Sequence, residues 1–250
     1  MATENPPEGS VGVCMSGLAP DLIANQVGLS EVLAVLAGVR PVFHSEADLQ
    51  HAFARVLWGL APQVECRLEV RQTASEGVEH LDLLCLGPLG RTAVEFKYVK
   101  RAWSGTAGAG PLEERYALKS HGAPDLARRD FVFDVARLER FCDGPDQNGL
   151  ALLVTNEPAL WQRPKPSGTQ SRDREFRLHE GCELSGTLLW GGGDFAPNTR
   201  VLRGTYPLHW RPYSQQPGTG GEFRCLALFV DPGAEASVEA VTPEAGNSPA

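Results

Sequence analysis

Two acids and a lysine near the middle of the chain have the types and the spacing to carry chemistry. Asp82 is followed after twelve residues by Glu95, and Lys97 stands two residues further on. Carboxylate oxygens are the ligands that Mg²⁺ prefers, and a bound magnesium ion activates water and stabilises charge on a phosphoryl oxygen. A nearby lysine can orient or deprotonate the attacking water, or neutralise developing negative charge. These residues are therefore sufficient in kind for the hydrolysis of phosphodiester bonds.

The spacing matters because a β-hairpin is predicted around these residues. Residues 79–86 and 91–98 are strand-like runs, and the Gly-Pro-Leu-Gly sequence at 87–90 is typical of a turn. A four-residue loop would pair Leu86 with Arg91. The hairpin register follows from that pairing.

In this register, Asp82 stands directly opposite Glu95. Opposed residues of an antiparallel pair point to the same face with Cβ atoms about 4.5–5.5 Å apart, and the alternation along a strand adds Lys97 to that face. Two carboxylates held so close repel each other unless a cation lies between them. The opposite face is predicted to pack on the core through Leu81, Leu83, Val94 and Phe96.

A helix is predicted from residue 45, before the hairpin. Its apolar residues between Leu49 and Leu60 recur at helical spacing on one face. Ser45 is a suitable N-cap, and Glu46 in the first turn complements the helix dipole.

The rest of the chain predicts an α/β domain around a mixed β-sheet. Residues 102–128 are Gly-rich and are expected to form an irregular segment or lid, followed by an amphipathic helix over 129–142. The run at 150–155 is apolar throughout, as in a strand covered on both faces. Additional C-terminal strands are expected near 186–190, 201–206 and 223–230.

The ends of the chain differ in composition from the middle. Residues 1–10 are polar and residues 232–250 are small and acidic, so both segments are predicted to be disordered, with a single domain over 11–231. The net charge of −8 argues against a general basic surface for nucleic acid. Any such contact must therefore be a local groove.

The six cysteines are far apart and include no C-x-x-C pair, which favours reduced thiols in a cytoplasmic protein. The N-terminus lacks the basic and apolar regions of a signal peptide, and the most apolar stretch is too short to cross a bilayer. We therefore expect a cytoplasmic protein with no membrane partner.

The arrangement of Asp82 with Glu95-Phe96-Lys97 resembles the D…(D/E)-x-K core of the PD-(D/E)xK nuclease superfamily, which has a restriction-endonuclease-like fold. The resemblance covers residues 44–161, in the order α-β-β-β-α-β. One departure is that His80-Leu81, without a proline, precedes the first acid.

The resemblance implies a Mg²⁺- or Mn²⁺-dependent endonuclease. By that likeness Asp82, Glu95 and the carbonyl of Phe96 would bind the metal, Glu46 would assist as a further acidic ligand, and Lys97 would serve catalysis. The implied substrate is nucleic acid, with DNA favoured over RNA. A role in defence or repair is expected, with the chain acting alone, as a homodimer or in a larger defence complex.

The sequence is compatible with alternative roles for several of these residues. Asp82 and Glu95 could be exposed charges on an edge hairpin with Lys97 as an ion-pair partner, and Glu46 could serve the helix dipole alone. Asp134 on the inward face of its helix needs a partner, and local hydrogen bonding is favoured over catalysis. Basic residues of the 157–182 loop could clamp phosphates or be solvated; they are Arg163, Lys165, Arg172, Arg174 and Arg177. The alternative function is a non-catalytic module that binds nucleic acid or protein and keeps the nuclease-like fold.

Overall fold

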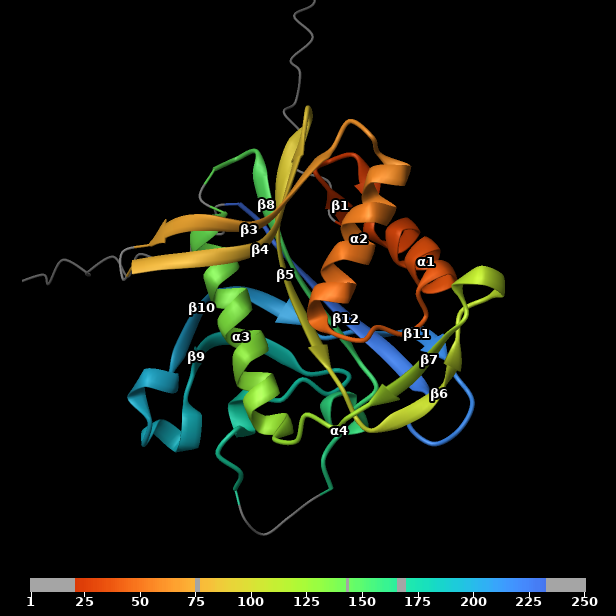
Figure 1. Cartoon of the computed structure of the whole chain (residues 1–250). Coiled ribbons are helices and arrows are strands. Elements are labelled where there is room, and N and C mark those ends of the chain that lie inside the picture. The colour runs from red at the N-terminus through yellow and green to blue at the C-terminus, as the bar shows by residue number, and fades with distance from the viewer. Residues whose placement is uncertain (1–20, 75–76, 143, 166–169, 233–250) are drawn as a thin grey trace, which may run out of the picture.

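A six-stranded mixed sheet forms the centre of the computed structural model, which describes residues 21–74, 77–142, 144–165 and 170–232 (Figure 1). β5 and β8 run parallel, and every other neighbouring pair in this sheet is antiparallel. In spatial order the strands are β11 (Trp210–Gln215), β12 (Glu222–Val230), β8 (Gln147–Thr155), β5 (Gly90–Val99), β4 (Gly77–Gly87) and β3 (Glu65–Ala74).

Helices cover both faces of this sheet. α1 (Leu29–Val39) and α2 (Glu46–Leu60) pack on one face, and α3 (Pro124–Phe141) packs on the other together with β9 (Glu183–Leu188) and β10 (Arg200–Pro207) (Figure 1). Each face has its own cluster of buried apolar side chains. The predicted α/β class with a mixed sheet flanked by helices is thus confirmed.

The elements of the predicted core follow one another as expected. α2, β3, β4 and β5 precede α3 and β8 in the order α-β-β-β-α-β, with one further β-hairpin inserted between β5 and α3. The side chain of Ser45 caps α2 by accepting a hydrogen bond from the backbone N of Asp48 at 3.2 Å. This cap fixes where the helix begins and therefore places Glu46 in its first turn.

The prediction for residues 102–128 was wrong. This segment contains an antiparallel hairpin of β6 (Trp103–Ala107) and β7 (Glu114–Leu118), and α3 already begins at Pro124 rather than at residue 129. Proline is favourable at the first position of a helix, because its missing N–H would have no partner there and its φ already suits the helix. Gly108 allows the chain to turn between the strands, because its φ of +99° is unfavourable for residues with a side chain.

The C-terminal strands β9, β10 and β12 lie close to the predicted ranges. The sequence analysis did not predict β11 or a small N-terminal pair of strands. That pair is β1 (Leu22–Ile23) and β2 (Val27–Gly28). The remaining helical segments are α4 (Pro158–Trp161) and the 3₁₀ turns Gly110–Leu112, Arg174–Phe176, Trp190–Gly193 and Ala196–Asn198.

The predicted disordered ends lie almost wholly outside the described residues, because the description begins at residue 21 and ends at 232. Within the part of the chain that is described, no helix is long and apolar enough to cross a membrane. No disulfide joins the five cysteines in the described part of the chain.

Candidate active site

The β4–β5 hairpin has the register that the turn predicted. Leu86 pairs with Arg91, and the ladder continues to the pair Leu83 and Val94, where it ends. The next residues on the two strands are Asp82 and Glu95. The two acids therefore stand at the point where β4 and β5 separate.

The side chain of Asp82 bridges the two strands where the backbone ladder ends. Its Oδ2 accepts a hydrogen bond from the backbone N of Phe96 at 2.7 Å. The strand also changes face here. Leu81 packs in the cluster on the α3 side, whereas Leu83 packs on the α2 side, so the prediction that both share one core face was wrong. The β3–β4 ladder also skips Asp82 and the residue opposite it, Glu69, whose φ is +53°, so the regular alternation of β4 is interrupted at Asp82.

Glu95 lies in the interior between the sheet and α3, with only 3% of its surface exposed. Its nearest cation is Arg137 on α3, whose Nη1 lies 3.4 Å from Oε1 of Glu95. This oxygen has no hydrogen-bond partner among the described residues. The carboxylate is therefore buried with incomplete compensation, and it is not an exposed charge on an edge hairpin.

Lys97 also faces α3, where its Nζ lies 3.0 Å from Oδ2 of Asp134. Asp134 is itself 3% exposed and forms a second ion pair with Arg137 at 2.5 Å. Asp134 therefore has the local partners that were predicted for an acid on the inward face of its helix. The charged groups between β5 and α3 therefore alternate in sign, in the order Glu95, Arg137, Asp134 and Lys97.

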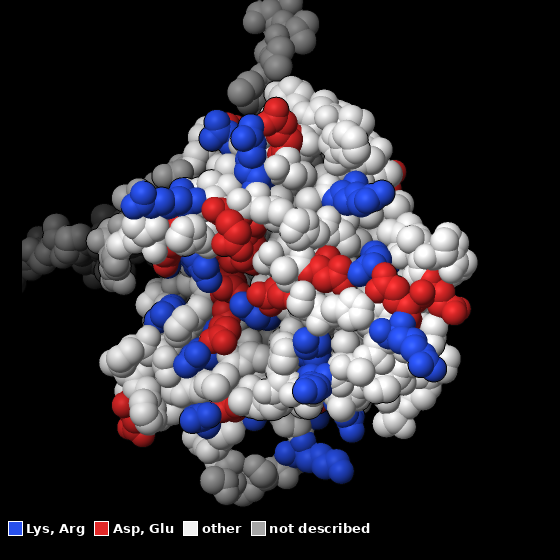
Figure 2. Space-filling model, in the orientation of Figure 1, with Lys and Arg blue, Asp and Glu red and all other residues white. Residues whose placement is uncertain are grey.

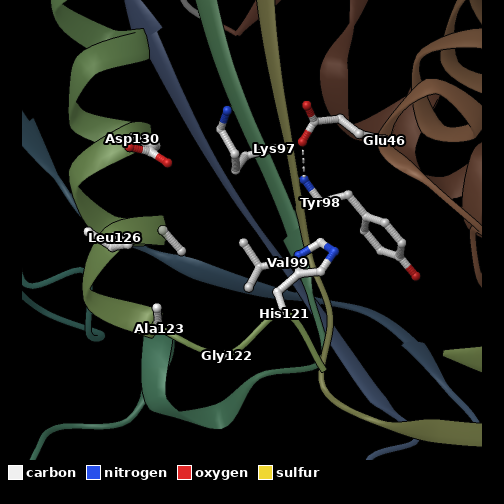
Figure 3. A pocket seen from close by; sticks show the side chains of 10 residues that line it. Glu46, Lys97, Tyr98, Val99, His121, Gly122, Ala123, Leu126 and Asp130 are labelled. Atoms are coloured by element: carbon white, nitrogen blue, oxygen red, sulfur yellow. Dashed lines mark hydrogen bonds between the residues drawn. The ribbon is translucent and has the colours of Figure 1, made fainter. Parts of the chain in front are cut away.

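Glu46 approaches the same strand from the other side. Its Oε2 accepts a hydrogen bond from the backbone N of Tyr98 at 2.8 Å, shown by the dashed line in Figure 3. In this view Lys97 lies between Glu46 and Asp130, which projects from α3. Glu46 is therefore part of the site and does more than complement the helix dipole.

A surface pocket of about 350 Å³ opens beside Glu46 and Lys97, whereas Asp82 and Glu95 do not line it. Glu46, Lys97 and Asp130 line one side of it, and His121 lines another together with the first turns of α3 (Figure 3). Figure 2 shows acidic and basic side chains meeting in the middle of this face, between α2 and α3, with further basic groups toward its edges. A substrate that enters the pocket would reach Lys97 directly.

The pKa shifts show that these groups act on one another. Burial raises the pKa of Glu95 to about 9, and the negative charges of Asp134 and Asp82 add to the rise. Burial likewise raises the pKa of Asp134 to about 6, partly opposed by Lys97. The pKa of Glu46 is raised by burial, with Lys97 opposing the rise and Asp82 adding to it.

Lys97 stays positively charged in this environment. Burial alone would lower the pKa of its ammonium group, but the neighbouring carboxylates, with Asp134 first and Glu46 next, raise it above the ordinary value. A lysine whose pKa is raised is a poor general base at neutral pH. Lys97 is therefore suited to holding and stabilising negative charge.

The site contains more acids than cations. Glu46, Asp82, Glu95 and Asp134 would carry four negative charges when ionised, against the two positive charges of Lys97 and Arg137. One divalent cation would supply this difference of two, provided that it displaces the proton that Glu95, with a pKa of about 9, holds at neutral pH. The hard oxygen donors and the partnerless buried oxygen of Glu95 fit such an ion in chemistry.

The donors are not gathered into a complete metal cage. Among the residues described, no three His, Cys, Asp or Glu side chains are grouped so that they could hold a metal ion. Mg²⁺ is commonly held by one or two carboxylates with waters and substrate oxygens, so two acids such as Asp82 and Glu95 would be enough in number. The contribution of the Phe96 carbonyl stays a prediction.

The sequence analysis did not single out Arg137, which forms ion pairs with Glu95 and Asp134. The available signal was its position three residues after Asp134, which places both on the same side of the helix. Among the basic residues of the 157–182 loop, Arg172 pairs with Asp125 and Arg177 pairs with Asp173. These two therefore already have carboxylate partners within the fold.

Comparisons of the chain with models of known protein families, with curated proteins and with solved structures gave no match.

Proposed function

We propose that the chain is a metal-dependent endonuclease that hydrolyses phosphodiester bonds of nucleic acid, with DNA favoured over RNA. The observation that carries the proposal is the convergence of Glu46, Asp82, Glu95 and Lys97 on one end of the β4–β5 hairpin. The order α2, β3, β4, β5, α3, β8 and the parallel pairing of β5 with β8 support a restriction-endonuclease-like fold.

The residues have distinct roles in the proposed reaction. A bound Mg²⁺ or Mn²⁺ would supply a Lewis acid and a water of lowered pKa. Asp82 and Glu95 would hold the ion, with Glu46 as the assisting acid. Lys97 would neutralise the charge that builds up on the phosphate oxygens, because its ammonium group stays protonated beside Asp134.

Arg137 and Asp134 would act through the catalytic groups. Arg137 forms an ion pair with the buried Glu95, and Asp134 forms one with Lys97. Partners of this kind fix the orientation of ligands and catalytic groups, and their loss typically costs about 10–100-fold in metal affinity or activity. We therefore assign them as positioning residues.

A second candidate function is a binding module without catalysis. The observation that favours it is that both charged groups of the E-x-K sequence already have partners on α3, since Glu95 faces Arg137 and Lys97 faces Asp134. In a pure binding module, these ion pairs would be structural. Metal binding distinguishes the two, because such a module needs no ion that depends on Asp82.

The test is a nuclease assay on single- and double-stranded DNA and RNA with Mg²⁺ or Mn²⁺. Asp82→Asn and Lys97→Met should each lower cleavage by at least about 100-fold, while the fold is preserved by circular dichroism. Lys119→Met is the matched control, because Lys119 is exposed outside the site. Cleavage that persists unchanged in both site variants would remove these residues from the mechanism.

A further inference from the structure

The two cysteines of the β3–β4 hairpin stand directly opposite each other. Cys66 on β3 and Cys85 on β4 are Cα partners in the antiparallel register. Opposed residues in such a pair have Cα atoms about 4.5–5.5 Å apart, which lies within the range of about 4.4–6.8 Å found for disulfides. The backbone therefore already has the spacing of a cross-strand disulfide, although both thiols are free.

The two thiols differ in their access to solvent. Cys85 is fully buried in the cluster under α1 and α2, whereas Cys66 is only partly buried. Cys66 also lines an open surface pocket of about 460 Å³ beside Trp58 and Pro62. A small reagent can thus reach Cys66 first, with Cys85 behind it.

The pair is also chemically unequal. A hydrogen bond from the Cys85 thiol lowers the pKa of Cys66, although burial opposes this shift. The same hydrogen bond, together with burial, raises the pKa of Cys85 well above its ordinary value. Because the thiolate is the nucleophile, Cys66 is the attacking thiol and Cys85 the resolving one.

We propose that Cys66 and Cys85 form a redox-sensitive dithiol, which hydrogen peroxide converts into a cross-strand disulfide. The Cys66 thiolate attacks one peroxide oxygen, the O–O bond breaks, and the departing hydroxide is protonated to water, which leaves Cys66 as a sulfenic acid. The Cys85 sulfur then attacks the Cys66 sulfur, the S–O bond breaks, and the hydroxide leaves with the Cys85 proton as a second water. Two thiols lose two electrons in total, and one peroxide becomes two waters.

This proposal is independent of the nuclease proposal, because the dithiol lies on the α2 face of the sheet and Lys97 faces α3. The product would link β3 to the strand that carries Asp82. A thiol reductant would reverse it by exchange through a mixed disulfide.

The experiment treats the full-length native protein with hydrogen peroxide, blocks the remaining thiols by alkylation in denaturant, and maps the peptides by mass spectrometry. We expect two of the six thiols to be lost, a Cys66–Cys85 linked peptide to appear, and dithiothreitol to restore both thiols. Cys225→Ser is the matched control, because this buried thiol belongs to the same apolar cluster and its loss should leave the linkage unchanged.

A variant isolates the first step. Cys85→Ser should stop the reaction at the Cys66 sulfenic acid, which a dimedone label detects. If this variant fails to fold, the peptide map of the wild-type chain decides alone. Peroxide that oxidises Cys66 to the sulfinic acid without any linked peptide, or that links other cysteines to the same extent, would overturn the proposal.

Discussion

The carboxylate of Glu95 is the most unfavourably placed acid of the site, and replacing it by an amide should stabilise the metal-free protein. Its pKa rises from 4.5 to about 9 on folding, chiefly because of burial and then because of Asp134. An acid whose pKa is higher in the folded state contributes fully to stability below pH 4.5, and this contribution is lost as pH rises toward 9. Glu95→Gln removes that dependence.

The size of the effect follows from the shift. At pH 7, about 2.5 pH units above the ordinary value, ionisation of Glu95 favours the unfolded state by about 3 kcal/mol, at 1.36 kcal/mol per pH unit. Glu95→Gln should therefore raise the free energy of unfolding by up to about 3 kcal/mol at pH 7 and by almost nothing at pH 4. The same variant should lose divalent-metal binding, because the amide is a weaker ligand.

Denaturant unfolding of the metal-free protein between pH 4 and pH 8.5 measures this difference. Glu139→Gln is the matched control, because Glu139 is also 3% exposed but accepts hydrogen bonds from Arg203, Gly204 and Tyr206. That variant should be less stable than the wild type, since an amide cannot accept all of these bonds. If Glu95→Gln destabilises the protein as Glu139→Gln does at every pH, the reasoning about Glu95 is refuted.

Three further variants test the surroundings of the site. Arg137→Ala should lower the free energy of unfolding by about 3 kcal/mol, because it removes the positive charge that pairs with Glu95 and Asp134. Mn²⁺ should then raise the melting temperature of this variant more than that of the wild type. An equal rise in both proteins would count against a shared charge deficit. Asp134→Asn removes the nearest counter-charge of Lys97 and should lower kcat by about 10–100-fold with little change in KM, measured in a steady-state cleavage assay; a loss confined to KM would contradict its role in positioning. Ser45→Ala should cost about 1 kcal/mol in denaturant unfolding, because it removes the cap of α2; unchanged stability would show that the cap contributes nothing.

The parts of the fold that follow from local rules could be predicted from the sequence. Ser45 marked the start of α2, and the turn at 87–90 set the register of β4 and β5, because the loop length and the strand period decide which residues face each other. That register is the reason why Asp82 and Glu95 were predicted to stand opposite each other. The family resemblance implied only that Glu46 assists at the site. Its hydrogen bond from the backbone N of Tyr98 depends on how α2 packs against β5 and could not be read from the sequence.

What could not be predicted depends on tertiary contacts. The glycines of residues 102–128 favoured an irregular segment, yet β6 and β7 pair because Trp103 and Tyr116 are buried in the α2-side cluster. The role of Arg137 also required the packing of α3 on β5, since no local pattern says which strand a helix faces. The change of face at Leu81 similarly follows an interruption of the β3–β4 ladder at Asp82, which strand alternation does not encode.

Calorimetric titration of the wild-type chain and of Asp82→Asn with Mn²⁺ tests most directly whether the acids of β4 and β5 share one ion. One binding event per chain in the wild type, and its loss in the variant, is the result that the charge deficit of this site predicts. Binding of equal strength in both proteins, or no binding to the wild type, would contradict it.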